Sequence, residues 1–176
     1  DRTGLVMFST CLRGQTGPEA PLAGYGTSGA ALSGLHSITG WPDRAPVGPW
    51  GAYTDFITPR LGVAALTAAL LHRGKTGEGQ HIDISQVECG INFLAPEVLD
   101  YTVNGNVAQA AGDGSPNAFP NGVYQVAGTS RYMTLSVENA AQWDALRCLA
   151  FPGRFAGKAF EDIDCRRRHG AEIDEA

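Results

Sequence analysis

The sequence predicts an α/β protein, because segments with strand periodicity alternate with segments with helix periodicity and no internal repeat is present. The chain has 176 residues, 43% of them hydrophobic and 18% charged, which is typical of a globular protein with a sizeable core. The composition changes within residues 104–120, where we expect a boundary between two parts of the chain.

The overall charge and the cysteine pattern argue against several classes of function. A net charge of -5, spread along the chain, disfavours nucleic acid as the main partner. The four cysteines are widely spaced, with no CxxC and no nearby histidine pair, so neither a zinc site nor a disulfide framework is predicted. We expect buried or idle thiols in a reducing compartment. His36, His72 and His81 have no metal-ligand spacing, which favours surface or packing roles and predicts no metal.

The sequence predicts no targeting segment, no membrane span and a cytoplasmic location. No signal peptide is visible, and no apolar run approaches the ~20 residues that a membrane span needs. Residues 5–9 have the composition of a buried strand with no partner before it, and residues 172–176 end in a helical pattern. Both ends indicate that the chain is a fragment of a longer protein.

A long segment rich in glycine and proline separates the predicted strand at residues 5–9 from the predicted helix at residues 61–72. Within that segment, residues 27–35 predict a short helix whose small side chains permit close approach to another helix or to a ligand. Residues 61–72 are apolar nearly all round and predict a buried helix, which the glycines of residues 73–79 end. Residues 80–85 alternate between apolar and polar side chains and predict a strand.

A capping-box spacing at residues 85–88 predicts that another helix begins there, with a kink at Pro96. Its expected apolar stripe consists of Val87, Ile91, Leu94, Val98 and Tyr101. After the loop at residues 104–120, residues 122–127 and 132–137 predict a β-hairpin. Residues 139–150 predict a helix that buries Trp143 and Leu146, and the three arginines at 166–168 are expected to form a solvated face.

Asp55 is the candidate catalytic residue, directly ahead of the predicted helix at residues 61–72. An acid in this position is commonly an N-cap that accepts backbone N–H bonds. The positive end of the helix dipole also favours an ionised carboxylate. Such a carboxylate can act as a nucleophile if an activated acyl group is brought to it. The position of Asp55 alone therefore leaves cap and nucleophile open.

Several short motifs follow one another in a particular order along the chain. They are residues 14–18, residues 24–26 with 33–35, residues 40–43 with 46–48, Asp55, residues 68–70 with 73–80, and residues 82–85. This succession resembles the family III CoA-transferases, the group that includes formyl-CoA:oxalate and crotonobetainyl-CoA:carnitine transferases. The resemblance extends from about residue 5 to residue 149.

The resemblance implies that Asp55 attacks an acyl-CoA thioester. The expected course is an acyl-aspartyl anhydride, an aspartyl-CoA thioester, a second anhydride with the acceptor acid, and the new acyl-CoA. The resemblance also implies that Tyr25 lines the CoA pocket, with Ala23, Gly24 and Gly26 around it, although an aromatic packed among glycines is the alternative for Tyr25.

The resemblance also implies a fold, an oligomeric state and substrates. Residues 1–104 would form the latter part of a Rossmann-like large domain, and residues 105–176 a linker and the start of a smaller α+β domain. The complete protein would be a homodimer that uses an acyl-CoA and a carboxylic acid, with coenzyme A thioesters as substrates and no tightly bound cofactor. Arg73 and Lys75 are either CoA-phosphate contacts or solvated turn charges.

Two alternatives to transfer stay open. Racemases of 2-methylacyl-CoA in the same family pair the aspartate with a histidine where this chain has Tyr25, and a phenol, which titrates near ~10, is a poor base at neutral pH. Two features that the resemblance implies are not found. The N-terminal part of the large domain is missing, and no glycine-rich flap is evident, although residues 112–114 lie in a comparable loop. A truncated, non-catalytic module is therefore the second alternative. A hydrolase is disfavoured because no GxSxG motif is present.

Overall fold

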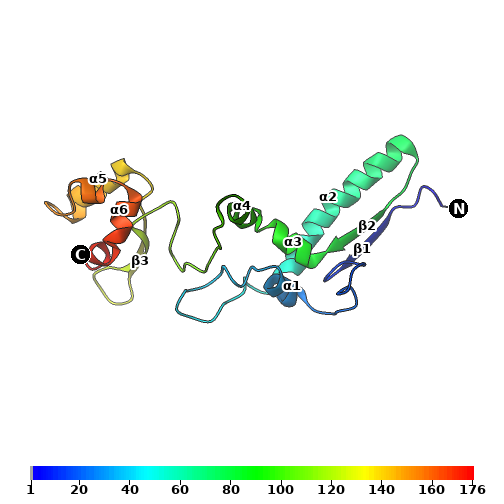
Figure 1. Cartoon of the computed structure of the whole chain (residues 1–176), viewed down its shortest axis with the longest axis horizontal. Coiled ribbons are helices and arrows are strands. Elements are labelled where there is room, and N and C mark those ends of the chain that lie inside the picture. The colour runs from blue at the N-terminus through cyan, green and yellow to red at the C-terminus, as the bar shows by residue number, and fades with distance from the viewer. Residues whose placement is uncertain (1) are drawn as a thin grey trace. The chain divides into compact units, whose positions relative to one another are not determined.

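The computed structural model describes residues 2–176, which form two compact units (Figure 1). The division falls between Ala110 and Ala111, and each unit has its own sheet and helices. The mixture of helices and strands confirms the predicted α/β class. That the two units are parts of a larger and a smaller domain stays a prediction.

The first unit is built on a parallel pair of strands. Its elements are, in chain order, β1 (Met7–Cys11), α1 (Gly26–Leu32), α2 (Tyr53–Thr76), β2 (His81–Ser85), α3 (Gln86–Asn92) and α4 (Ala95–Asn104). Strand β1 pairs with β2 in a register that runs from Met7 opposite His81 to Cys11 opposite Ser85. Both strands were predicted, but β1 is not buried, because these two strands have no further strand beside them among the described residues.

Helix α2 is longer than predicted and begins at Tyr53 rather than near residue 61. It continues through Pro59, because Thr54, Ile57 and Thr58 in its first turns are buried. This tertiary packing outweighs the poor helix propensity of proline. The helix ends at Gly77, whose φ of 77° is the left-handed conformation that glycine adopts at helix ends.

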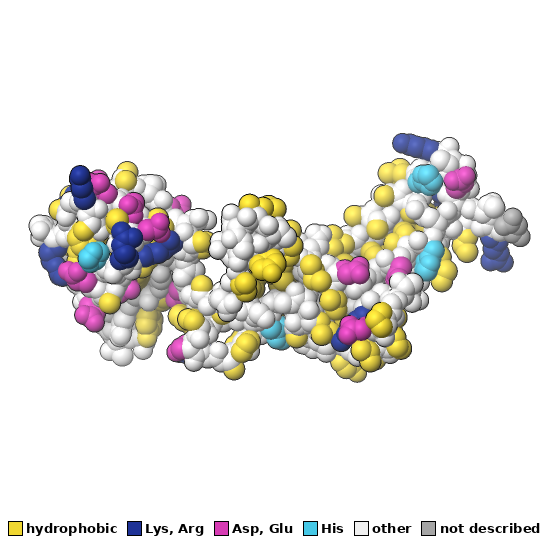
Figure 2. Space-filling view, in the orientation of Figure 1, with side chains coloured by type: hydrophobic (Ala, Val, Ile, Leu, Met, Phe, Trp, Pro, Cys, Tyr) yellow, Lys and Arg dark blue, Asp and Glu magenta, His cyan; other side chains and the backbone are white. Residues whose placement is uncertain are grey.

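The prediction of a buried helix at residues 61–72 is wrong, because most of these side chains in α2 are exposed or only partly buried. Val63 and Leu71 are 65% and 63% exposed, and Figure 2 shows hydrophobic side chains on the visible surface over α2 and α4. By length and composition alone α2 could cross a membrane, although the sequence contains no uninterrupted apolar run of the length that a span needs. Core helices of globular proteins meet the same criterion.

The predicted third helix of this unit is two helices. Ser85 caps α3 as the capping-box spacing predicted, since its hydroxyl accepts from the Glu88 N–H at 3.2 Å. The chain then breaks at Phe93 and Leu94, and Pro96 lies in the first turn of α4, where a missing N–H is tolerated. Of the expected apolar stripe only Leu94 is buried, in a cluster with Ala30 and Leu35.

The second unit consists of a hairpin and short helices. Its elements are β3 (Asn121–Gln125), β4 (Tyr132–Ser136), α5 (Ala140–Ala150), the 3-10 helix η1 (Lys158–Phe160), α6 (Ile163–Arg168) and α7 (Gly170–Asp174). The antiparallel pairing of β3 with β4 and the helix α5 confirm the prediction. The core contains Val137, Trp143, Phe155 and Ile173.

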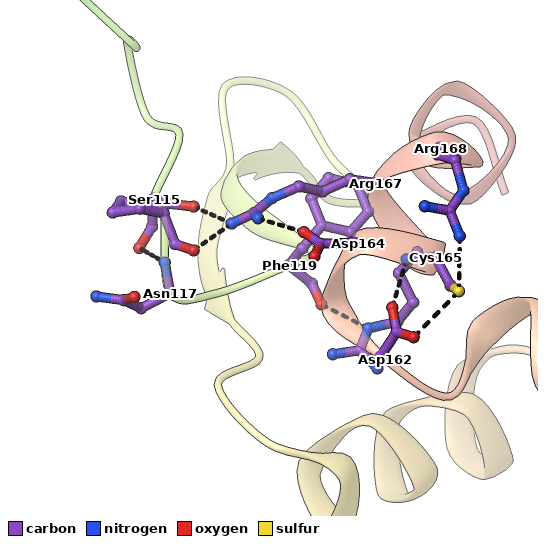
Figure 3. Close-up of polar contacts among 10 residues, drawn as sticks. Ser115, Asn117, Phe119, Asp162, Asp164, Cys165, Arg167 and Arg168 are labelled. Atoms are coloured by element: carbon purple, nitrogen blue, oxygen red, sulfur yellow. Dashed lines mark hydrogen bonds and ion pairs between the residues drawn. The ribbon is translucent and has the colours of Figure 1, made fainter. Parts of the chain in front are cut away.

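The predicted solvated face of arginines is wrong for two of the three residues. Arg166 is 3% exposed and donates to the carbonyls of Phe119, Phe160 and Glu161, with its guanidinium 5.2 Å from the Trp143 ring centre. Arg167 donates to the Ser115 carbonyl at 2.7 Å and pairs with Asp164 at 3.1 Å (Figure 3). These arginines therefore join α6 to the loop that precedes β3. Only Arg168 is exposed.

Candidate functional site

Asp55 lies in the first turn of α2, where its side chain is exposed to solvent. It is the third residue of the helix and not its cap, since Ala52 holds the N-cap position. The capping alternative for Asp55 is therefore wrong, because the helix begins earlier than the sequence predicted. Its carboxylate accepts hydrogen bonds from two other helices instead.

The carboxylate of Asp55 is held between the first residues of α1 and α3. The backbone N–H of Gly26 donates to Oδ2 at 3.3 Å, and the side-chain amide of Gln86 donates to Oδ1 at 2.8 Å. Gly26 is the first residue of α1, and Gln86 is the first residue of α3. The starts of three helices thus converge on one carboxylate.

Thr54 links the two donors behind the carboxylate. Its side chain is fully buried, and its hydroxyl lies 2.9 Å from the Gly26 carbonyl and 3.1 Å from Oε1 of Gln86. An ionised carboxylate only accepts hydrogen bonds, so the Gln86 nitrogen must face Asp55 and the oxygen must face Thr54. The Asp55 carboxylate therefore sets the orientation of the Gln86 amide, and the single hydroxyl proton of Thr54 lies between two acceptors, the Gly26 carbonyl and Oε1 of Gln86.

The close approach of the helices requires small residues. A Cβ at Gly26 would lie 2.7 Å from Cγ of Asp55 and 2.7 Å from the Ala52 carbonyl oxygen. On α3, a Cβ at Gly90 would lie 2.6 Å from Cβ of Ser33. The small-residue helix predicted near residues 27–35 does allow a close approach to other helices, as proposed from the sequence.

Tyr25 precedes α1 and is 79% exposed, so it is not packed among the glycines around it. Ala23 and Gly24 are also exposed, whereas Gly26 is buried against Asp55. Of the residues predicted to contact CoA, only Gly26 touches the Asp55 carboxylate. The CoA contacts of all four stay a prediction.

The structure does not bring Arg73 and Lys75 to Asp55. Both lie in the last turn of α2, and at ~1.5 Å per residue Arg73 is about 27 Å from Asp55 along the helix axis. His81 bonds with the Ser9 hydroxyl at 2.9 Å, and His72 lies 4.0 Å from Glu78. Among residues 2–176, no group of three or more His, Cys, Asp or Glu side chains is placed to hold a metal ion.

Sequence reasoning missed several features around Asp55. Gln86 and Thr54 are ordinary polar residues in the sequence, and the only signal was the capping box that placed Gln86 at a helix start. An apolar pocket of about 420 Å³ also lies along the first turns of α2. It is lined by Trp50, Tyr53, Phe56, Ile57, Arg60 and Phe93.

The chain is similar to known proteins over nearly its whole length. The family model described as CoA-transferase family III matches residues 2–176. The chain is 37% identical over 143 residues to the succinate–glutarate CoA-transferase of Agrobacterium fabrum, a match that covers 81% of this chain and 35% of that protein. It is 27% identical over 172 residues to the succinyl-CoA–D-citramalate CoA-transferase of Chloroflexus aurantiacus, which covers 98% of this chain and 43% of that protein.

A solved structure has the same fold. The crystal structure of a CAIB/BAIF family protein from Brucella suis matches with a TM-score of 0.83 at 30% identity, over 98% of this chain and 46% of that chain. The chain thus spans less than half the length of these relatives. The match over residues 2–176 shows that the chain belongs to CoA-transferase family III.

Proposed function

We propose that the complete protein carrying this chain transfers CoA from an acyl-CoA thioester to a carboxylic acid, with Asp55 as the nucleophile. The observation that supports this proposal is the exposed Asp55 carboxylate, held by Gly26 on one oxygen and by Gln86 on the other. A nucleophile of this kind must reach its substrate and keep a fixed orientation. Both conditions are met in the first unit alone.

The proposed reaction begins when one oxygen of Asp55 attacks the thioester carbonyl and the CoA thiolate leaves. The thiolate then attacks Cγ of Asp55, which releases the first acid as a carboxylate and forms the aspartyl-CoA thioester. The acceptor carboxylate attacks Cγ in turn and expels the thiolate, giving a second anhydride. The thiolate finally attacks the acyl carbonyl of that anhydride, so that the new acyl-CoA leaves and Asp55 is regenerated.

This sequence of steps requires no general base. Every nucleophile in it is already an anion, and every leaving group is a carboxylate or a thiolate, so no proton has to be moved. No histidine side chain is hydrogen-bonded to Asp55 among the described residues. The site therefore supplies what transfer needs more readily than what racemisation needs, since racemisation requires acid and base partners on the substrate α-carbon.

The names of two relatives suggest a first substrate. One is named for succinate and glutarate, and the other for succinyl-CoA and D-citramalate. We propose succinyl-CoA as the donor to test first, with dicarboxylic acids as acceptors. A cytoplasmic homodimer and CoA contacts at Ala23, Gly24, Tyr25 and Gly26 complete the proposal.

The test is mass spectrometry of the complete protein after mixing with succinyl-CoA and trapping with hydroxylamine or borohydride. We expect a modification on the peptide that contains Asp55, and none in Asp55→Asn, while Asp43→Asn is a matched control at an exposed carboxylate. An unmodified Asp55, together with exchange of the substrate α-proton into deuterated water, would replace transfer by racemisation. Binding of CoA without any turnover would support a non-catalytic module.

A further inference from the structure

The two oxygens of the Asp55 carboxylate are held unequally. Oδ1 accepts from the Gln86 amide at 2.8 Å, whereas Oδ2 accepts from the Gly26 N–H at 3.3 Å. The longer of the two lies just beyond the usual N–H···O range of about 2.7–3.2 Å and is the weaker hydrogen bond. Oδ2 is therefore the freer oxygen for attack, and Oδ1 is the oxygen that remains as the carbonyl after attack.

The Gln86 amide is preorganised to face Oδ1. Its Oε1 lies 3.1 Å from the hydroxyl of fully buried Thr54, and its backbone starts α3 directly after the capping residue Ser85. Turning the amide around would place its oxygen against the carboxylate, where two acceptors would repel each other. A donor that is fixed before charge develops stabilises that charge without reorganisation.

We propose that the Gln86 amide is the oxyanion donor for the two steps in which Cγ of Asp55 becomes tetrahedral, a role that rests on the transfer reaction proposed above. When the CoA thiolate attacks Cγ of the first anhydride, the carbonyl electron pair moves to Oδ1, which faces Gln86. The intermediate collapses by breaking the bond from Cγ to Oδ2, so that Oδ2 leaves with the first acid. The Gly26 N–H lies on that departing oxygen.

The same donor serves the attack of the acceptor. The acceptor carboxylate adds to Cγ of the aspartyl-CoA thioester, the electron pair again moves to Oδ1, and the thiolate leaves as the carbonyl re-forms. The first and last steps differ, because their tetrahedral carbon belongs to the acyl group and not to Asp55. Gln86 should therefore control the two middle steps and have much less effect on the first acylation.

This division predicts which step is slow in a variant. Gln86→Met keeps the length of the side chain and removes the donor. With succinyl-CoA and no acceptor, the first anhydride of the variant should return to succinyl-CoA faster than the thiolate attacks Cγ. The CoA adduct on Asp55, followed by mass spectrometry of quenched samples, should therefore form more slowly in the variant than in the original protein.

Steady-state kinetics give a second readout. We expect kcat to fall by about 10²-fold in Gln86→Met, the effect typical of losing one oxyanion donor, with little change in KM for succinyl-CoA. A loss in KM alone would assign Gln86 to substrate binding and overturn the proposal. Unchanged kcat and an unchanged rate of CoA-adduct formation would also overturn it, even where the original protein forms the Asp55 adduct.

Variants of Thr54 keep the test informative if Gln86→Met does not fold. Thr54→Val removes the hydroxyl that contacts Oε1 of Gln86 and should lower kcat in the same direction, while Thr54→Ser, which keeps a hydroxyl, should retain the activity. Thr58→Val is the matched control, because Thr58 is also buried in α2 and its hydroxyl makes no hydrogen bond to Asp55 or Gln86. Equal effects of the valine variants at 54 and 58 would count against the proposal. Failure of the original protein to form any adduct would instead reject the transfer reaction itself.

Discussion

The Gln86 amide nitrogen lies 2.8 Å from Oδ1 of Asp55, although the two residues are 31 positions apart in the chain. The contact exists because α1, α2 and α3 pack with their first turns together. Glycines at the contacts let the backbones approach, and a capping serine places Gln86 at the start of its helix. The proposed nucleophile is thus oriented by helix packing as well as by its own position in α2.

Because there is no space for a side chain between Gly26 and Asp55, we expect substitution of Gly26 to lower activity. In Gly26→Ala the new Cβ would lie 2.7 Å from Cγ of Asp55, so the carboxylate or the helix must move. A misplacement of about 1 Å lowers rates by about 10²-fold, and we expect at least that loss of transferase activity in the complete protein. Steady-state kinetics with succinyl-CoA would measure it.

Gly74→Ala is the matched control for that variant. Gly74 also lies in α2, and nothing is within 4 Å of the position a Cβ would take. Replacing this glycine in the last turn of the helix by alanine should stabilise the protein by at most about 0.5–1 kcal/mol without a loss of activity. Wild-type activity in Gly26→Ala would show that the approach of α1 to Asp55 is not needed for function.

Arg166 should be the arginine of the 166–168 cluster that matters most for stability. Burial lowers the pKa of its guanidinium below the ordinary value, and its donors reach three backbone carbonyls. Arg166→Met would leave those carbonyls without their donors, at a cost of about 2–4 kcal/mol in the free energy of unfolding. Urea denaturation followed by the fluorescence of Trp143 would measure the loss. Arg168→Met, at an exposed position, should change the unfolding free energy by no more than about 0.5 kcal/mol.

Tyr124 should give the second unit a dependence on alkaline pH. Desolvation, the hydrogen bond to Asp174 and the charge of that carboxylate raise the pKa of the Tyr124 phenol well above its ordinary value of 10.0. A raised pKa favours the protonated form in the folded state, so this contribution to stability is complete below about pH 10 and is lost as the pH rises above it.

Tyr124→Phe tests this dependence. At pH 8 the variant should be less stable by about 1 kcal/mol, because the hydrogen bond from the phenol to Asp174 at 2.9 Å is lost. The difference from the original protein should shrink in denaturation experiments above pH 10. Tyr132→Phe, at a residue that is 63% exposed, should show neither effect. A pH-independent difference would contradict the assignment to Tyr124.

The cysteines should differ in reactivity toward a maleimide. Burial raises the pKa of the Cys89 thiol, and the residue is only 6% exposed, whereas Cys148 is exposed on α5. Because the thiolate is the reactive form, Cys148 should be labelled first and Cys89 should be protected in the folded protein. Peptide mass spectrometry would give the order, and labelling in urea, where both should react, is the control. Equal labelling of both residues in the folded protein would contradict the buried position of Cys89.

Local patterns in the sequence were sufficient to predict most elements. The alternation in residues 80–85, the cap at Ser85 and the hairpin of the second unit depend on neighbours in the chain, and the structure confirms them. The start of α2 could not be predicted in this way. Its first turns are stabilised by contacts with α1 and α3, which outweigh the local cost of Pro59.

The sequence by itself determined the α/β class and the order of most elements, and its resemblance to a family made Asp55 the candidate nucleophile. Only the tertiary structure decided that Asp55 is not a cap, that Gln86 and Gly26 hold its two oxygens, and that Arg166 is buried. The physical reason is the distance along the chain over which each kind of interaction acts. Propensity and periodicity act between residues a few positions apart, whereas these hydrogen bonds join segments that meet only when helices pack, and a lone polar residue carries no signal of its distant partner.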